Sequence, residues 1–111
     1  MTTAAARRFY GDALGLKLRA HDVAQGYCLF DAGNVELVVE AVPADAPEHD
    51  RALVGRFTGL SFRVPSVHVA HQDLLQRGVV FTAAPERQFW GGVLASFRDP
   101  DGNEFQIAQR P

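Results

Sequence analysis

The sequence predicts an α+β fold built from two similar halves, and three observations carry this prediction. The first is a β-hairpin over residues 91–107, in which apolar and polar residues alternate on both sides of a turn. The second is an echo of that hairpin, because FDAGNVELV at 30–38 matches FRDPDGNEFQI at 97–107. The third is that each half has a helical pattern ending at a glycine, Gly15 or Gly78. Matching landmarks lie about 65 residues apart, as an internal duplication would give.

Length and composition indicate one domain over residues 1–111. The chain is 47% hydrophobic and 22% charged, which is ordinary for a globular domain with its own core. The net charge of −2, with mixed signs, offers no basic surface for nucleic acid. No apolar run approaches the roughly 18 residues of a membrane helix. The single cysteine excludes an intrachain disulfide and is typical of a reducing compartment, so we expect a cytoplasmic protein without nucleic-acid or membrane partners.

The first half begins with a predicted helix over residues 4–14. Thr2 or Thr3 can cap its N-terminus, and Gly15 can end it in the left-handed conformation. Three strands are expected next, over 16–20, 27–31 and 35–41, the last of them rich in valine. Residues 42–56 hold prolines and no hydrophobic period, which predicts a linker without regular structure.

The second half opens with a predicted strand over 59–64, which Pro65 ends. Ser66 can cap a helix that runs to Gln76 and ends before Gly78. The residues expected to face the core from this helix are Val67, Ala70, Leu74 and Leu75. A short strand over 79–82 and a proline-containing connection then lead to the hairpin. Its turn, DPDGN at 99–103, has residues suited to a turn at nearly every position.

Four segments of the chain resemble the vicinal oxygen chelate superfamily, which includes glyoxalases, bleomycin-resistance proteins and extradiol dioxygenases. They are FYGDALGL at 9–16, TGLSF at 58–62, FWGG at 89–92 and FRDPDGNEF at 97–105. The resemblance covers residues 5–108 and is specific for the fold, whereas it says much less about the reaction. It implies paired βαβββ modules whose sheets curl around a shared cleft, here a first module at 1–41, a linker at 42–58 and a second module at 59–111.

The first strand of the first module is missing from this pattern. The second half has its leading strand at 59–64, but the first half begins directly with the helix. We favour truncation as the explanation, with a native chain that tolerates the gap as the alternative. A missing strand leaves backbone groups unpaired on its neighbour, and a partner chain could cover them. Because resembled proteins often complete or wall their clefts with a second chain, a homodimer is expected.

Strand alternation assigns the cleft-facing residues. If Leu37, Phe62, Phe97, Phe105 and Ile107 pack under the helices, their neighbours point into the cleft. These neighbours are Glu36, Val38, Glu40, Gly59, Ser61, Arg63, Leu94, Ser96, Arg98, Glu104 and Gln106. Of these, Glu36, Val38, Ser61, Arg63, Leu94, Ser96 and Gln106, joined by Trp90, are the predicted ligand-binding residues. The alternative is that Arg63 and Arg98 merely pair with Glu40 and Glu104 on a wet sheet surface.

The resemblance also implies where metal ligands would stand, and the residues there are poor donors. Metal-dependent members use the first and last strand of each half. Glu36 and Gln106 match the last-strand positions, Gly59 takes the place of a usual histidine, and the fourth position falls on the missing strand. A transition metal needs three or four good donors, so no metal is expected and Glu36 and Gln106 are only weak candidates.

Other reactive side chains lack a recognisable catalytic arrangement. His68 and His71 share a helix face but are expected on the outside of the sheet, exposed to solvent. Cys28 lies within a strand and is predicted to be a small buried side chain. Trp90, followed by Gly91 and Gly92, could close over a flat ligand or could instead plug the rim of the barrel.

Three functions are compatible with this pattern. A metal-independent small-molecule binder, like the bleomycin-resistance members, is favoured, with Trp90 stacking on the ligand while Glu36, Arg63 and Gln106 orient it. A glyoxalase-like lyase or isomerase, or an extradiol dioxygenase, would need a metal held by Glu36, Gln106 and further residues. The third possibility is a degenerate structural domain without a ligand.

Overall fold

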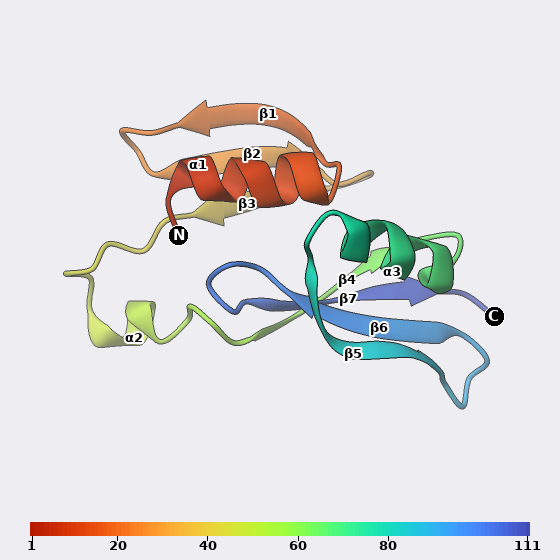
Figure 1. Ribbon diagram of the computed structural model, residues 1–111. Helices are drawn as coiled ribbons and strands as arrows, with labels where there is room; N and C mark the ends of the chain where they lie inside the picture. The colour runs from red at the N-terminus through yellow and green to blue at the C-terminus, as the bar shows by residue number, and fades with distance from the viewer. The chain divides into compact units, whose positions relative to one another are not determined.

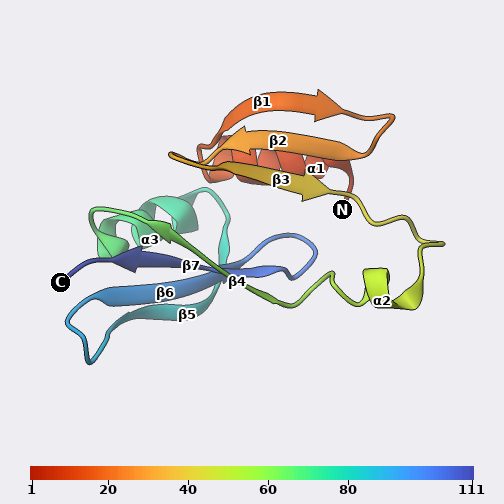
Figure 2. The ribbon, with the colours of Figure 1, turned by 180° about the vertical axis from the view of Figure 1, so that it is seen from behind.

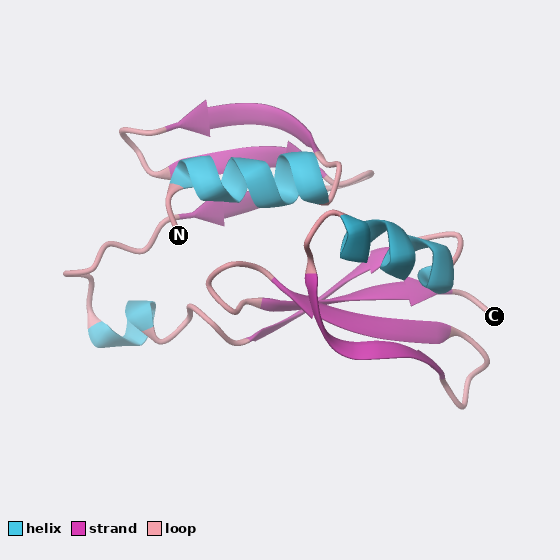
Figure 3. Ribbon diagram, in the orientation of Figure 1, coloured by secondary structure: helices cyan, strands magenta, loops and turns pink.

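The computed structural model describes all residues from 1 to 111 and confirms the predicted α+β class (Figure 1). The chain divides into two compact units, Met1–Val54 and Gly55–Pro111. Each unit has a helix packed on one face of its own β-sheet, as the colouring by secondary structure makes plain (Figure 3). The first sheet has three strands and the second has four.

The first helix forms where it was predicted, but most of it is wound more loosely than an α-helix. It consists of α1 (Thr3–Ala6), which continues into a π-helical stretch, η1 (Arg7–Ala13). Thr2 caps it, since its Oγ1 accepts a hydrogen bond from the backbone N–H of Ala5 at 3.0 Å. Gly15 follows with φ of 79°, the left-handed conformation expected at the end of the helix.

The first sheet is an antiparallel meander of β1 (Lys17–Asp22), β2 (Tyr27–Asp31) and β3 (Glu36–Glu40). The view from behind shows the three strands in front of the helix that covers their other face (Figure 2). Tyr10 from the helix and Phe30 from β2 form the centre of the core, at 1% and 0% exposure, with ring centroids 5.7 Å apart. β3 pairs only with β2, so the sheet lacks a fourth strand at this edge, as the sequence predicted.

The connection between the two sheets was expected to have no regular structure, and this is wrong for one turn. A short helix, α2 (Glu48–Arg51), lies within it. Pro47 precedes the helix, and Glu48 and Asp50 lie in its first turn, where the N-terminal dipole favours negative charge. A helix this short shows no hydrophobic period, which is why the pattern missed it.

The second sheet holds β4 (Phe57–Arg63), β5 (Val80–Arg87), β6 (Val93–Arg98) and β7 (Glu104–Gln109), in the order β4-β7-β6-β5. β4 runs parallel to β7, and the other neighbours are antiparallel. Four phenylalanine rings pack together on the face that the helix α3 (Val67–Gln76) covers. Phe97, at 0% exposure, has its ring centroid 6.3 Å from that of Phe62, 5.8 Å from Phe81 and 5.7 Å from Phe105.

The helix of the second unit, α3 (Val67–Gln76), has the predicted bounds and cap. The hydroxyl of Ser66 accepts a hydrogen bond from the N–H of Val69 at 3.2 Å. Val67 and Leu74 are buried as expected, but Leu75 is 47% exposed, so its assignment to the core is wrong. The apolar stripe of this helix is narrower than the sequence suggested, and Leu75 lies beside it.

The strand predicted at 79–82 is longer than expected, because β5 continues to Arg87. Pro85 was interpreted as part of an irregular connection, since proline cannot donate to a strand ladder. It is tolerated here because β5 is an edge strand whose pairing with β6 is irregular between Ala83 and Glu86. The extension brings the chain to the Trp90 loop, which then leads back into β6.

Candidate functional site

The second sheet has one covered face and one uncovered face, and most predicted site residues of this unit lie on the uncovered one. In β4, Phe62 points towards α3 and joins the phenylalanine cluster. Ser61 and Arg63, on either side of it, therefore point the other way. The pairing of β4 with β7 sets Ser61 beside Gln106, and β6 adds Ser96 beside Gln106 and Leu94 beside Ala108.

A hollow of about 280 Å³ opens at the end of β4 and β7. Its lining consists of Ser61, Arg63, Trp90, Ala108, Gln109 and Arg110. The structure thus brings together Ser61, Arg63 and Trp90, three of the predicted ligand-binding residues. Leu94, Ser96 and Gln106 lie on the same sheet face but do not line the hollow.

Trp90 forms one wall of the hollow and is held there by Gly92. A Cβ atom added to Gly92 would overlap the Trp90 ring and the carbonyl oxygen of Gln109. The indole therefore rests directly on the backbone at the start of β6, in a space that only glycine leaves open. Because 43% of the Trp90 surface is exposed, a ring face remains available to a ligand. Its neighbour Phe89 is fully exposed and does not line this hollow.

Ser61 and Gln106 are joined directly. The Ser61 hydroxyl donates a hydrogen bond to Oε1 of Gln106 at 3.1 Å. This bond crosses from β4 to β7 and fixes both side chains on the uncovered face. Ser96, beside Gln106 on β6, is only 9% exposed and lies deeper in the sheet.

Three lining residues were not predicted. Ala108 and Arg110 continue the alternation that already placed Glu104 and Gln106 on this face, so extending the period past Ile107 would have found them. Gln109 points the other way, where its side-chain oxygen accepts a hydrogen bond from the N–H of Val67 at 2.9 Å. It holds the start of α3 against β7.

The alternative left open by the sequence, that Arg63 and Arg98 pair with Glu40 and Glu104, does not occur as ion pairs. Arg98 lies opposite Glu104 in the β6–β7 register, but the Glu104 carboxylate accepts a hydrogen bond from the Thr82 hydroxyl at 2.8 Å. Arg63 has neither an ion pair nor a hydrogen bond. Glu40, its other suggested partner, lies on β3 of the first unit.

The remaining predicted ligand-binding residues, Glu36 and Val38, belong to the first unit. Both lie on β3, where residues alternate between exposed and half-buried, and both are exposed. Leu37, between them, is half-buried as expected for the helix-covered face. These two residues therefore occupy the uncovered face of their own sheet.

The metal positions implied by the resemblance hold a poor set of donors. Gly59 has no side chain, and it lies at an irregularity of the β4 ladder with φ of 77°. The oxygen of Gln106 already accepts the hydrogen bond of Ser61 and carries no charge. No three His, Cys, Asp or Glu side chains come together as a possible metal centre. The residues of the second unit thus do not fit a transition metal.

Cys28 and His21 form a pair that the sequence did not suggest. They are direct neighbours across β1 and β2. Cys28 is fully buried, as predicted, and its thiol donates to the carbonyl oxygen of Thr3 at 3.5 Å. Burial raises the pKa of the Cys28 thiol, and the nearby Arg7 charge offsets this only in part. A buried thiol with a raised pKa is a weak nucleophile, so Cys28 does not support nucleophilic chemistry here.

The two histidines of α3 differ from each other. His68 is exposed, as predicted. His71 is half-buried and meets the ring of Phe81 edge to face, with centroids 4.5 Å apart, so the prediction of an exposed side chain is wrong there. Both lie on the covered side of the sheet, away from the hollow.

No helix of the structure is long and apolar enough to span a membrane.

The fold is that of a class of small α+β proteins with two helix-covered sheets. Comparison with known proteins identifies the superfamily. The model of the Glyoxalase/Bleomycin resistance protein/Dioxygenase superfamily matches residues 2–107. The chain therefore belongs to this superfamily, as its motifs indicated. It is 34% identical to the uncharacterized protein YraH of Bacillus subtilis (strain 168) over 106 residues, covering 89% of this chain and 83% of YraH.

Solved structures show the same fold. A superfamily member from Sphaerobacter thermophilus DSM 20745 superposes with a TM-score of 0.77 at 24% identity, covering 99% of this chain and 90% of that one. TnmS3, an antibiotic-binding protein from Streptomyces sp. CB03234, superposes with a TM-score of 0.76 at 28% identity, covering 100% of this chain and 88% of TnmS3.

Proposed function

We propose that this protein binds an organic small molecule without a metal, in a cleft to which the uncovered face of the second sheet contributes. The observation that carries the proposal is the hollow beside β4 and β7, where a partly exposed tryptophan stands next to an arginine and a serine. Apolar ring surface combined with a few polar groups is the usual character of a small-molecule site. Glu36 and Val38, on the uncovered face of the first sheet, stay predictions as ligand-binding residues.

The comparisons support binding more specifically than they support a reaction. The superfamily name covers glyoxalases, resistance proteins and dioxygenases, so membership alone leaves the chemistry open. TnmS3 is described as an antibiotic-binding protein, and its structure matches 100% of this chain. A binder also fits the absence of a good donor at the Gly59 and Gln106 positions.

The proposal is tested by measuring melting temperature across a panel of aromatic antibiotics and aromatic metabolites. A ligand present at one hundred times its Kd raises the free energy of unfolding by about 2.7 kcal/mol, which is readily seen as a shift of the melting temperature. Trp90→Ala should abolish the shift. Phe89→Ala is the matched control, because it removes the neighbouring exposed aromatic ring, which does not line the hollow beside β4 and β7. If both variants respond like the native protein, Trp90 does not belong to the site.

Calorimetric titration with Ni²⁺, Zn²⁺, Fe²⁺ and Mn²⁺ tests the metal-dependent alternative. The proposal expects no stoichiometric binding to the native chain. Saturable binding that is lost in Glu36→Ala and Gln106→Ala would instead favour a glyoxalase-like enzyme or an extradiol dioxygenase.

We also propose that the protein is a homodimer. The open edge of β3 and the uncovered sheet faces are surfaces that a second chain could cover. Sedimentation equilibrium over a range of concentrations measures the mass directly. A monomer at all concentrations would contradict this part of the proposal.

A further inference from the structure

The charge of the hollow indicates what kind of molecule it accepts. Two of its six lining residues, Arg63 and Arg110, carry guanidinium groups, and none carries a carboxylate. In the β4–β7 register Arg63 lies beside Ala108, and Arg110 follows two residues later on the same face. The two cations therefore lie at the same end of the sheet, Arg63 at the end of β4 and Arg110 directly after β7.

Neither arginine is neutralised by the protein. Arg19 shows the contrast, since its guanidinium is 2.8 Å from the Asp31 carboxylate. Arg63 and Arg110 have no ion pair and no hydrogen bond to the chain. The acidic residues on this face lie further off. Glu86 on β5 is two strands from Ala108, about 10 Å at the usual strand spacing, and Glu104 is about 13 Å along β7 and hydrogen-bonded to Thr82. The forks of both guanidinium groups are free to bind a carboxylate or a similar planar anion.

The other lining groups add a flat apolar surface. Trp90 presents a partly exposed ring whose position is fixed by its contact with Gly92. Ser61 has its hydroxyl proton committed to Gln106, so it offers an acceptor rather than a donor to a ligand. Recognition of an anionic group in this hollow therefore falls to the arginines, and recognition of a ring falls to Trp90.

We infer that the ligand is an aromatic compound that carries a carboxylate, with its ring on Trp90 and its anionic group between Arg63 and Arg110. This inference rests on the proposed binding function and narrows the ligand to one chemical class. It also predicts rejection of cationic ligands, because two like charges would face them at the mouth of the hollow.

Three probes with one ring system and different charge test the inference. They are 2-naphthoate, its neutral amide 2-naphthamide, and the cation (2-naphthyl)methylammonium. Trp90 is the only tryptophan of the chain, so quenching of tryptophan fluorescence reports contact with this residue alone. Calorimetry gives the affinity independently. We expect the acid to bind about tenfold more tightly than the amide, the cation to bind most weakly, and the affinity of the acid to fall with added salt.

Arg63→Gln and Arg110→Gln should each weaken 2-naphthoate binding roughly threefold to fivefold and leave 2-naphthamide binding unchanged, since the guanidinium groups are exposed. Arg98→Gln is the control, because it removes an exposed arginine from the same sheet face outside the hollow. If the amide or the cation binds as tightly as the acid, or if the arginine variants match Arg98→Gln, the inference is overturned while the binding function stands. If no probe quenches Trp90 or produces heat, the inference is overturned, and the melting-temperature panel decides the binding function separately.

Discussion

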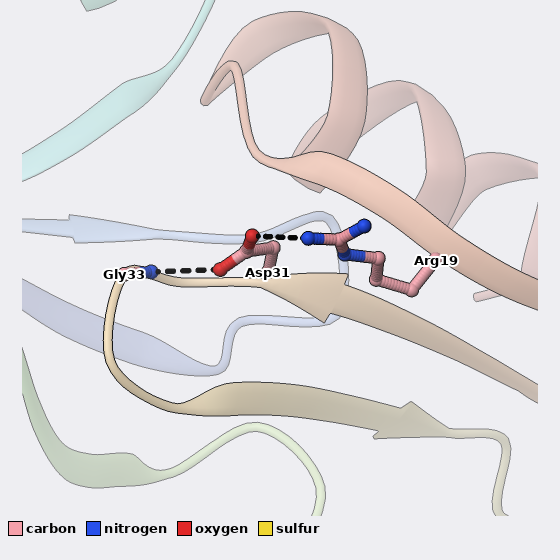
Figure 4. A network of polar contacts seen from close by, with 3 residues as sticks. All are labelled: Arg19, Asp31 and Gly33. Atoms are coloured by element: carbon pink, nitrogen blue, oxygen red, sulfur yellow. Dashed lines mark hydrogen bonds and ion pairs between the residues drawn. The ribbon is translucent and has the colours of Figure 1, made fainter.

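The two units have the same plan, yet the turn that closes each one is held very differently. Both have an aspartate at the end of the strand before the last and a glycine in the turn that follows, Asp31 with Gly33 and Asp99 with Gly102. Asp31 lies at the surface, where it bonds the N–H of Gly33 and the guanidinium of Arg19 (Figure 4). Asp99 is 3% exposed and accepts three hydrogen bonds from its own turn.

The difference extends to the sheets. β7, the last strand of the second unit, has β6 on one side and the parallel β4 on the other. β3, its counterpart in the first unit, has only β2. The second unit thus has its last strand in the interior of a sheet, whereas the first has it at an edge. A similar sequence motif therefore contributes unequally to stability, depending on what surrounds it.

The largest expected effect is the loss of a central core ring. Phe97→Ala should lower the free energy of unfolding by about 4–5 kcal/mol, because the ring packs against three other phenylalanines and its removal leaves a cavity. Phe30→Ala should cost about 3–4 kcal/mol, since its ring packs against that of Tyr10. Urea denaturation measures both.

Phe89→Ala, at a fully exposed position, is the control and should change stability by less than about 0.5 kcal/mol. A larger loss for Phe30→Ala than for Phe97→Ala would mean that the first unit has the more tightly packed core, contrary to the comparison.

The two turns give the next largest contrast. Asp99→Ala should lower the free energy of unfolding by about 2–3 kcal/mol, because the N–H groups of Asp101 and Asn103 lose their acceptor in a partly buried turn. Asp31→Ala should cost much less, since water can replace the carboxylate at the surface.

Asp99→Asn sharpens this comparison. It keeps one side-chain oxygen for the backbone N–H groups but loses the second oxygen, which accepts from Nδ2 of Asn103 at 2.7 Å. Its stability should fall between those of the native protein and Asp99→Ala. Equal losses in Asp99→Ala and Asp31→Ala would show that burial does not separate the two turns.

The edge position of β3 should be visible in amide hydrogen exchange. About half of the β3 N–H groups point away from β2 and have no strand partner, whereas those of β7 face a strand on both sides. For the monomer we expect peptides covering 36–40 to exchange in part within the fastest phase and peptides covering 104–109 to stay protected. Full protection of β3 would mean that another chain pairs with its edge.

The parts of the fold that the sequence predicted well are those fixed by local chemistry. The caps at Thr2 and Ser66 and the turn at 99–103 depend on side chains bonding to nearby backbone, so their spacing alone indicates them. The strand predicted at 79–82 was shorter than β5, because proline, here Pro85, breaks strands in most settings. Only the position of β5 at the sheet edge makes that proline acceptable, and this position is a tertiary property.

The candidate site shows the same division. Alternation along β4 placed Ser61 and Arg63 on the uncovered face, because a strand fixes the side of every second residue. For Trp90 the sequence left two positions open, beside a ligand or at the rim of the barrel, because its position depends on the loop before β6 and on the missing Cβ of Gly92. Arg110 lies beyond the predicted end of the hairpin, which is why it was overlooked.

The smallest expected effect is the pH dependence of the Asp31 turn. The hydrogen bond from Arg19, then that from the N–H of Gly33, hold the pKa of Asp31 below its ordinary value. A pKa that is lower in the folded than in the unfolded state adds stability above the unfolded pKa, and this stability is lost as the pH falls through the folded pKa. The stability difference between native protein and Asp31→Asn should therefore be largest near neutral pH and fade in acid. Asp45→Asn, which removes an exposed carboxylate without a hydrogen bond, is the control. A difference for Asp31→Asn that stays constant from neutral pH into acid would show that Arg19 and Asp31 do not interact in solution.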